Sequence, residues 1–150
     1  MNEKLMHVLT SRTFVDTNVL FYAVNIDNPE KYARASAALT FLWQQDELPT
    51  ISTQILQELY VTLIRSKVDI DAAQKIVKDY FVWNVIAIGT FLIDEAFHFQ
   101  RRYLLSFWDS LVLASAQLSH CKYLLTEDLN HGQKYGKVMA INPFHDGYGA

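Results

Sequence analysis

The sequence is poor in the residues that build several common kinds of site. Its single cysteine, Cys121, excludes an internal disulfide framework and a cysteine-cluster zinc site. The five histidines form no HxxxH pair, and there is no glycine-rich phosphate loop and no G-x-S-x-G nucleophile motif. The scarcity of cysteine is typical of proteins in a reducing cytoplasm, which is where we expect this protein to work.

Long hydrophobic runs are also missing. No apolar stretch approaches the length that crosses a bilayer, and the first residues, Met1 to Lys4, lead to no signal-peptide core, so we expect no membrane association. Of the 150 residues, 51% are hydrophobic and 19% are charged, which predicts a globular protein that buries a core of its own. This length fits a single domain.

Positive charge is in short supply as well. Thirteen Lys and Arg residues against sixteen Asp and Glu residues give a formal net charge of −3. This balance argues against a protein that holds nucleic acid mainly by a broad basic surface. It leaves open an enzyme that meets phosphate groups through bound cations.

The chain does contain short apolar strands that alternate with helices. The predicted strands are residues 12–16, 48–52, 84–88, 122–126 and 138–141. The predicted helices are residues 17–24, 29–45, 53–66, a helix that begins at Asp69 or Asp71, residues 91–105, and residues 106–118. Such alternation predicts a parallel sheet with helices on both faces. Residues 1–11 are expected to be a loose lead-in, and residues 143–150 a fraying tail.

Asp16 stands at the most informative point of the chain. In Phe14-Val15-Asp16-Thr17-Asn18 an apolar strand ends, one carboxylate follows, and a helix begins. Side chains at the carboxyl ends of strands in an open α/β sheet face the crevice where ligands bind, so Asp16 is a candidate site residue. The alternative is that Asp16 only caps the following helix, which aspartate does well.

Two more aspartates are predicted to reach the same edge of the sheet. Asp128 lies just past the strand at 122–126, although aspartate is also common in turns. Asp109 begins a helix, and Ser106-x-x-Asp109 also matches a capping box. That helix is almost wholly apolar and has no Lys or Arg three or four residues after Asp109, so this carboxylate needs a partner from elsewhere.

Two glutamates have weaker claims to a function. Glu58 lies on the polar face of its predicted helix, and taken alone it is interpreted as a solvated surface residue. Glu127, next to Asp128, is the rival for any acidic role in that loop. Carboxylates that converge without basic partners repel one another and require cations. Because all-oxygen ligands select Mg²⁺ or Mn²⁺ over zinc, those ions are the expected ones.

Four short segments resemble, in this order, the motifs of one family. They are Val15 to Leu20, Ile51 to Leu59, Ser106 to Leu111, and Leu125 to Gly132. Together they make the chain similar to a PIN domain, most closely a VapC-type toxin of bacterial or archaeal toxin–antitoxin pairs. The resemblance implies an α/β fold in a single domain over residues 1–150, with a three-layer α/β/α sandwich around a mostly parallel sheet of about five strands.

The resemblance also implies a site and an activity. The residues that would bind Mg²⁺ or Mn²⁺ are Asp16, Glu58, Asp109 and Asp128, with Asn18 and Thr126 as supporting polar residues. On this basis Asp128 is preferred to Glu127. The implied activity is metal-dependent endonucleolytic cleavage of RNA, restrained by a cognate antitoxin protein, in a protein that is often a homodimer.

Two other functions remain open from the sequence. A catalytically silent PIN-like module could bind protein or RNA through the plentiful aromatic residues, 13% of the chain, because a fold does not fix a function. A phosphatase that forms an aspartyl-phosphate is disfavoured, because Asp16-Thr17-Asn18 lacks the second aspartate that such enzymes usually carry two residues on.

Overall fold

The computed structural model describes residues 1–148, and the strands among these residues form one six-stranded sheet. The strands are β1 (Thr13–Val15), β2 (Thr50–Ser52), β3 (Asn84–Ile86), β4 (Tyr123–Leu125), β5 (Lys134–Tyr135) and β6 (Val138–Ile141). Their order is β3-β2-β1-β4-β6-β5, and every pairing is parallel except that of β5 with β6. The mostly parallel sheet is confirmed, and the expected number of about five strands is one too low.

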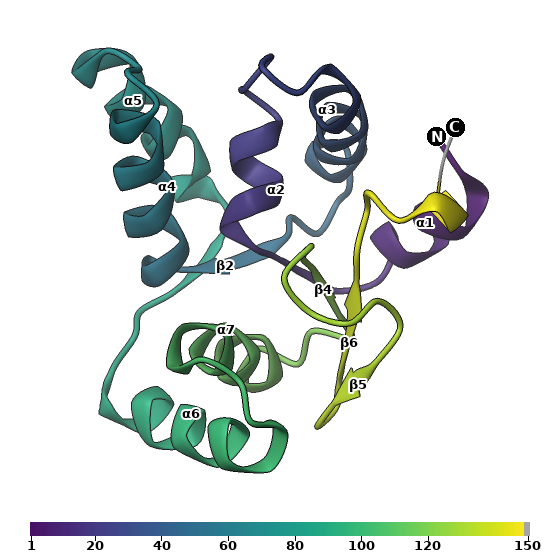
Figure 1. Cartoon of the computed structure of the whole chain (residues 1–150), viewed down its shortest axis with the longest axis vertical. Coiled ribbons are helices and arrows are strands. Elements are labelled where there is room, and N and C mark those ends of the chain that lie inside the picture. The colour runs from purple at the N-terminus through teal and green to yellow at the C-terminus, as the bar shows by residue number, and fades with distance from the viewer. Residues whose placement is uncertain (149–150) are drawn as a thin grey trace.

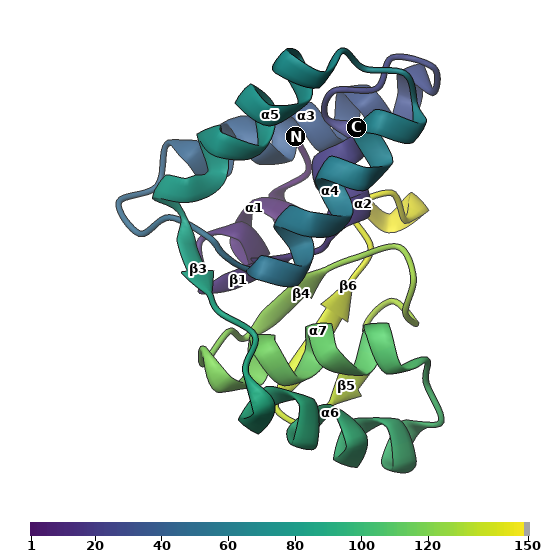
Figure 2. The ribbon, with the colours of Figure 1, turned by 90° about the vertical axis from the view of Figure 1, so that its left-hand side faces the viewer.

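Helices cover both faces of this sheet. They are α1 (Glu3–Leu9), α2 (Thr17–Tyr22), α3 (Pro29–Trp43), α4 (Thr53–Arg65), α5 (Ile70–Asp79), α6 (Thr90–Tyr103) and α7 (Phe107–Leu118), with 3₁₀ turns η1 (Tyr80–Val82) and η2 (Asp146–Tyr148). Figures 1 and 2 show α6 and α7 on one face and α1 to α5 on the other, which confirms the α/β/α sandwich. None of the helices within residues 1–148 is both long and apolar enough to span a bilayer.

Strand β1 lies at the topological switch point of the sheet, where the strand order reverses. From β1 the chain moves outward to β2 and β3, and it then returns to place β4 on the other side of β1. All residues of β1, β2 and β4 are buried, since both faces of these central strands are covered by helices. In open α/β sheets a reversal of this kind leaves a crevice at the carboxyl ends of the strands.

Residues 3–9 form a helix, so the prediction of a loose lead-in over residues 1–11 is wrong. The side chain of Asn2 caps α1 by accepting a hydrogen bond from the Lys4 N–H, at 2.8 Å. Leu5, Val8 and Leu9 follow at helical spacing and are buried in the core. Seven residues are too few for a stable isolated helix, so α1 depends on this packing.

The C-terminal part of the chain also contains structure that the sequence reading left out. Strand β5 pairs with β6 through a tight hairpin in which Gly136 has a φ of 60°, a conformation that glycine adopts readily. Arg34 donates hydrogen bonds to the carbonyls of Phe144, at 2.9 Å, and of His145, at 2.7 Å. Residues 143–148 of the expected fraying tail are therefore bound to the helical layer, and residues 149–150 of it lie outside the described residues.

The packing of α1 predicts the effect of a substitution in it. Leu9 is 1% exposed, so Leu9→Ala should lower the free energy of unfolding by about 2–5 kcal/mol, because it leaves a cavity in the core. Met6, on the same helix, is 37% exposed, and Met6→Ala should change stability by roughly 0.5 kcal/mol or less. Denaturant unfolding measures both values, and a loss for Leu9→Ala as small as the one expected for Met6→Ala would show that Leu9 does not pack in the core.

Candidate functional site

The register of β1 against β4 brings the first candidate residues together. Val15 at the end of β1 is paired with Leu125 at the end of β4, and the Asp16 N–H donates to the Leu125 carbonyl at 2.9 Å. The residues that follow the two strands, Asp16 and Thr126, are consequently neighbours. Both side chains are buried at the carboxyl edge of the sheet.

A hydrogen-bond network fixes the Asp16 carboxylate. One of its oxygens accepts a bond from the Thr17 N–H at 2.8 Å, so the capping role that the sequence offered as the alternative is real. The other oxygen accepts a bond from the Thr126 hydroxyl at 2.7 Å. The Asn18 amide donates to Asp128 Oδ2 at 3.0 Å and reaches Asp16 Oδ2 at 3.5 Å. Asn18 and Thr126 thus hold two of the candidate carboxylates, Asp16 and Asp128, in fixed positions.

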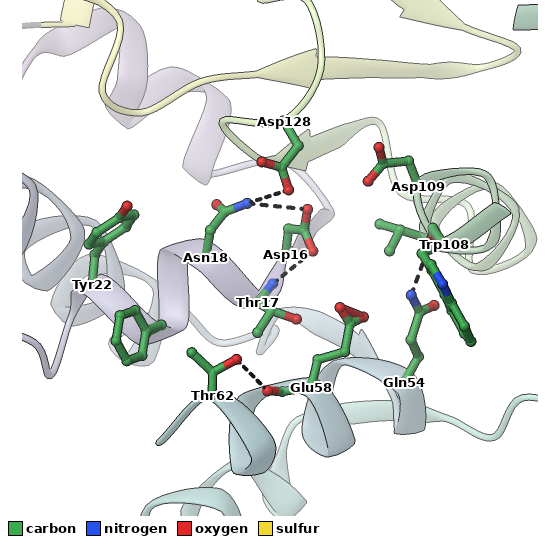
Figure 3. Close-up of a pocket in the computed structure, with 12 residues that line it drawn as sticks. Asp16, Thr17, Asn18, Tyr22, Gln54, Glu58, Thr62, Trp108, Asp109 and Asp128 are labelled. Atoms are coloured by element: carbon green, nitrogen blue, oxygen red, sulfur yellow. Dashed lines mark hydrogen bonds between the residues drawn. The ribbon is translucent and has the colours of Figure 1, made fainter. Parts of the chain in front are cut away.

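The remaining candidates arrive from the helices on either side of the sheet. Asp109 lies in the first turn of α7, where the Ser106 hydroxyl accepts a hydrogen bond from its N–H at 3.1 Å, as a capping box predicts. Glu58 lies in α4, in the opposite helical layer. Figure 3 shows Asp16, Glu58, Asp109 and Asp128 around one cleft of about 220 Å³, which all four residues line.

The four carboxylates are not equally close to one another. Asp16, Asp109 and Asp128 each contribute one oxygen atom to a group in which all the oxygens lie within 4.8 Å of one another. Glu58 lines the same cleft but is not a member of that group. It is half-buried, with one carboxylate oxygen, Oε1, that has no hydrogen-bond partner, so the prediction of a solvated surface residue is wrong.

Burial and mutual repulsion shift the acidity of three of these groups. Burial raises the pKa of Asp16 from 3.8 to about 7, the hydrogen bonds from Thr126 and Thr17 oppose this shift, and the charges of Asp128 and Glu58 add to it. Burial, together with the neighbouring acids, also raises the pKa of Glu58 and of Asp109. A cleft that contains several carboxylates is therefore costly to ionise without a positive partner.

Basic side chains do not supply that partner. Among the ion pairs within residues 1–148, none involves a carboxylate of this cleft. Lys31, which reaches the loop after β4 from α3, binds Glu127 at 2.6 Å instead. Glu127 is thus neutralised outside the cleft, whereas Asp128 is free to face Asp16.

The donor set fits a hard divalent cation. It consists of three carboxylate oxygens in mutual reach and an unpartnered buried oxygen of Glu58 beside them. Oxygen ligands of this kind suit Mg²⁺ and Mn²⁺. The described residues that line the cleft include no histidine or cysteine, the residue types that favour zinc.

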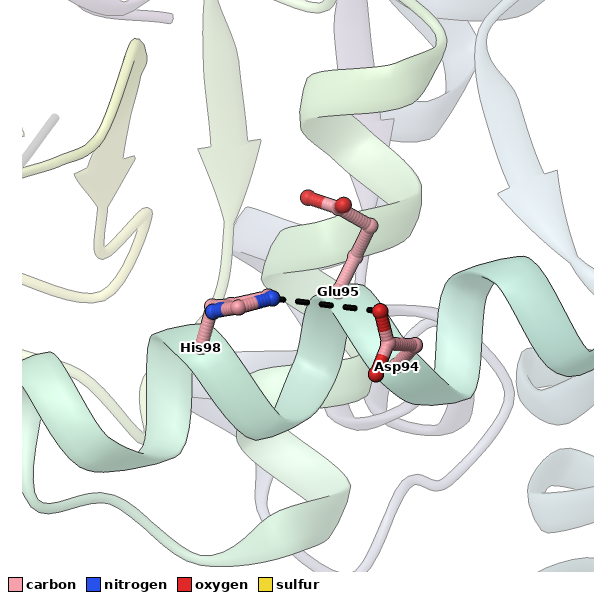
Figure 4. Close-up of side chains that lie close together, drawn as sticks. All are labelled: Asp94, Glu95 and His98. Carbon is pink, nitrogen blue, oxygen red and sulfur yellow. Dashed lines mark ion pairs between the residues drawn. The ribbon is translucent and has the colours of Figure 1, made fainter.

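A second group of possible ligands lies elsewhere and has a different character. Asp94, Glu95 and His98 lie within one turn of α6, and Figure 4 shows all three projecting from that helix alone. The His98 and Asp94 side chains face each other at 3.8 Å and are exposed to solvent. Such a pair is an ordinary feature of a helix surface and indicates no site.

The residues that line the cleft include several that were not predicted from the sequence, among them Thr17, Gln54 and Trp108. The buried Thr17 hydroxyl and the Gln54 Oε1 atom lack hydrogen-bond partners, and Trp108 lies on the rim beside Asp109. Gln54 precedes Glu58 by one helical turn, a spacing that places both on one face of α4 and could have pointed to it. No pattern in the sequence marks Thr17 or Trp108.

Comparisons with known proteins give one matching family model and several solved structures of similar fold. The model of the PIN domain family matches residues 13–137. No curated protein matches the chain. Among solved structures, the Sarcin-Ricin loop cleaving toxin VapC20 of Mycobacterium tuberculosis is similar, with a TM-score of 0.62 and 20% identity over 77% of this chain and 91% of that one.

Two complexes are similar to a comparable degree. A toxin–antitoxin complex from Klebsiella pneumoniae has a TM-score of 0.64 and 21% identity, over 87% of this chain and 97% of that one. VapBC2 from Rickettsia felis, bound to a DNA fragment from its promoter, has a TM-score of 0.57 and 21% identity, over 85% of this chain and 96% of that one. At these identities the likeness establishes a shared fold.

The raised pKa of Asp16 predicts how stability depends on pH when divalent cations are absent. Folded Asp16 keeps a proton that the unfolded chain releases, so the free energy of unfolding should fall as pH rises from about 4 to about 7. Asp16→Asn should remove this component and stabilise the metal-free chain by roughly 1–4 kcal/mol near neutral pH and above.

Denaturant unfolding over this pH range, in the presence of a chelator, measures the effect. Asp27→Asn, at an exposed aspartate outside the cleft, is the matched control, and its curve should follow that of the unsubstituted chain. If Asp16→Asn shows the same pH dependence as this control, Asp16 does not titrate as its burial implies.

Proposed function

This chain belongs to the PIN domain family, and from that premise we propose that it is a Mg²⁺- or Mn²⁺-dependent endoribonuclease, the toxin of a toxin–antitoxin pair. One observation carries the proposal. Asp16, Asp109 and Asp128, from three distant segments, converge within 4.8 Å of one another, and no lysine or arginine of the described chain neutralises them. Charges of one sign are gathered at such a cost where a cation is bound.

In this proposal Asp16, Asp109 and Asp128 hold the metal, with Glu58 beside them. A bound Mg²⁺ or Mn²⁺ would supply positive charge at a phosphodiester and lower the pKa of a water molecule. Asn18 and Thr126 keep the carboxylates oriented through the hydrogen bonds described above, which reduces the reorganisation required during the reaction.

Glu58 has a role of its own in the proposal. Its Oε1 atom has no partner, and burial raises its pKa, which makes the carboxylate a stronger base. Attack of water on phosphorus breaks one P–O ester bond. The water loses a proton, which Glu58 is suited to accept, and the oxygen that leaves the phosphorus gains one.

The partners follow from the same reading. The proteins of similar fold in the Klebsiella and Rickettsia structures are toxin–antitoxin complexes, which supports a cognate antitoxin for this chain. Large apolar side chains that remain exposed, among them Ile70, Phe81 and Val82, are available for an antitoxin or for a second copy in a homodimer. Because the substrate is RNA, the proposal includes action in the cytoplasm.

Cleavage of RNA tests the proposed activity. The chain should cut total RNA in the presence of Mg²⁺ or Mn²⁺ and not with a chelator, and Asp16→Asn should lower the rate at least about a hundredfold because it removes a charge that the metal requires. Cleavage mapping by sequencing of the fragment ends gives the rates and sites. Full activity of Asp16→Asn would reject the assignment.

The loop after β4 offers a matched pair of substitutions. Asp128→Asn and Glu127→Gln each remove one negative charge from adjacent positions, but only Asp128 lines the cleft. We expect cleavage to fall roughly a hundredfold or more in the first variant and less than about fivefold in the second. The reverse order would exchange the roles of the two residues.

Calorimetric titration with Mn²⁺ separates this proposal from a catalytically silent PIN-like binding module. We expect saturable binding that Asp109→Asn weakens by about tenfold or more, since one ligand of the ion loses its charge. Asp94→Asn, in the exposed group on α6, should leave binding unchanged. A chain that binds no Mn²⁺, yet still binds protein or RNA, would be the silent module.

A further inference from the structure

Trp108 occupies an unusual place for a large aromatic side chain. It is 62% exposed, although it lies next to Asp109 and lines the acidic cleft. An indole ring left in water forgoes a large hydrophobic stabilisation. Single exposed apolar residues are common on protein surfaces. The feature of Trp108 that requires an explanation is its position on the rim of an acidic cleft.

The backbone of Trp108 is held in place although its ring is exposed. Gln54, which is buried in α4, donates from Nε2 to the Trp108 carbonyl at 3.2 Å, so it links the two helical layers across the cleft. The Ser106 hydroxyl caps the same turn of α7. The helix start that carries both Trp108 and Asp109 is therefore fixed relative to Glu58, which lies one turn after Gln54.

Other aromatic rings restrict the Trp108 ring itself. The Phe107 ring packs edge-on against it, with the centroids 5.2 Å apart and an interplanar angle of 73°, and Phe97 lies behind Phe107 at 5.9 Å. A ring that is positioned before a ligand arrives loses little conformational entropy on binding. Trp108 thus presents a flat, solvent-facing ring, in contact with Phe107, at the edge of the cleft.

The cleft has an aromatic residue on its other side too. Figure 3 shows Tyr22 and Trp108 on opposite sides of the acidic side chains. Tyr22 packs edge-on against Phe144, at 5.4 Å between the centroids. A polynucleotide whose phosphate lies over the carboxylates would therefore meet an aromatic ring on each side.

We propose that Trp108 is a substrate-positioning residue, on which one unpaired base of the RNA stacks next to the phosphate that is cut. The inference rests on the proposed function and adds to it the residue that holds the neighbouring nucleotide. Bases stack on exposed aromatic rings without regard to sequence, because every base has a π face. A base paired within a duplex has both faces covered and cannot reach the ring.

Nucleic acid suits this position better than a protein partner does. Trp108 shares the lining of the cleft with the polar and acidic residues Asp109, Glu58 and Gln54, although its own ring contact is with Phe107. A protein hot spot would be expected in a dry apolar patch that excludes water around the ring. The flat ring beside a phosphate-binding group instead matches the alternation of base and phosphate along a single strand.

Binding of a short, unstructured, dye-labelled RNA of mixed sequence tests the proposal. Ca²⁺ replaces Mg²⁺ so that cleavage is suppressed, and fluorescence anisotropy gives the dissociation constant. Trp108→Ala should weaken binding roughly 5- to 150-fold, the range for loss of one stacked base, and Trp108→Phe should restore most of the affinity. Phe91→Ala is the matched control, because Phe91 is 62% exposed, lies in α6 and does not line the cleft.

An RNA of the same length that carries abasic nucleotides distinguishes stacking from a general structural role. The intact chain should bind it about as weakly as Trp108→Ala binds the normal RNA, and Trp108→Ala should lose little further affinity for it. In Mg²⁺, Trp108→Ala should raise the KM for cleavage of the normal RNA and change kcat less than about threefold. Thermal melting should show that the exposed substitution leaves the fold intact.

The possible outcomes separate the two proposals. If the intact chain cleaves RNA but Trp108→Ala binds and cleaves it equally well, the role of Trp108 is overturned and the nuclease stands. The role of Trp108 is also overturned if the change from normal to abasic RNA weakens binding to Trp108→Ala as much as it weakens binding to the intact chain. It is overturned as well if Trp108→Ala impairs only the binding of a protein partner. If the intact chain neither binds nor cleaves RNA, both proposals fail.

Discussion

The side-by-side pairing of β1 with β4 is the constraint on which the rest of the structure depends. It joins the first strand to one that is more than a hundred residues later in the chain, and its register makes Asp16 and Thr126 neighbours. The Thr126 hydroxyl and the Asn18 amide then bind the carboxylates of Asp16 and Asp128, so that like charges stay close. A shift of one residue in this register would turn these side chains away from the cleft.

This arrangement has an electrostatic cost that the hydrogen bonds from Thr126 and Thr17 offset only in part. Asp16 is 6% exposed, and burial raises its pKa to about 7, because water no longer stabilises the charged form. The ammonium group of Lys31 is bound to Glu127 and also lies over the Tyr22 ring. The packing thus leaves the carboxylates of the cleft to a ligand from solution, and a divalent cation has the charge to balance them.

The helices contribute by fixing positions across the two layers. Asp109 and Trp108 share the first turn of α7, and Gln54 ties that turn to α4, one helical turn before Glu58. This hydrogen bond between the two helical layers fixes the Trp108 edge of the acidic cleft relative to Glu58. The proposed action of these groups on one phosphodiester would need this rigidity, because a displacement of about 1 Å can cost a large part of a rate.

By itself the sequence determined the local structure and the candidates. Apolar strands alternate with helices such as those at 29–45 and 53–66, and this alternation predicted the layered α/β fold. Asp16, Asp109 and Asp128 were candidates because they lie at the ends of strands or the start of a helix. The helix α1 (Glu3–Leu9) is not predicted by the sequence, because a segment so short is stable only when it is packed against the core.

Tertiary structure alone decided which acids meet. Taken residue by residue, the sequence predicted Glu58 as a surface residue and left Glu127 as a rival of Asp128, and only the family resemblance favoured Glu58 and Asp128. The structure places Glu58 in the cleft, since α4 faces α7 there, and it pairs Glu127 with Lys31. Such proximity between distant segments is set by packing and strand register, and a single sequence does not encode it in any local pattern.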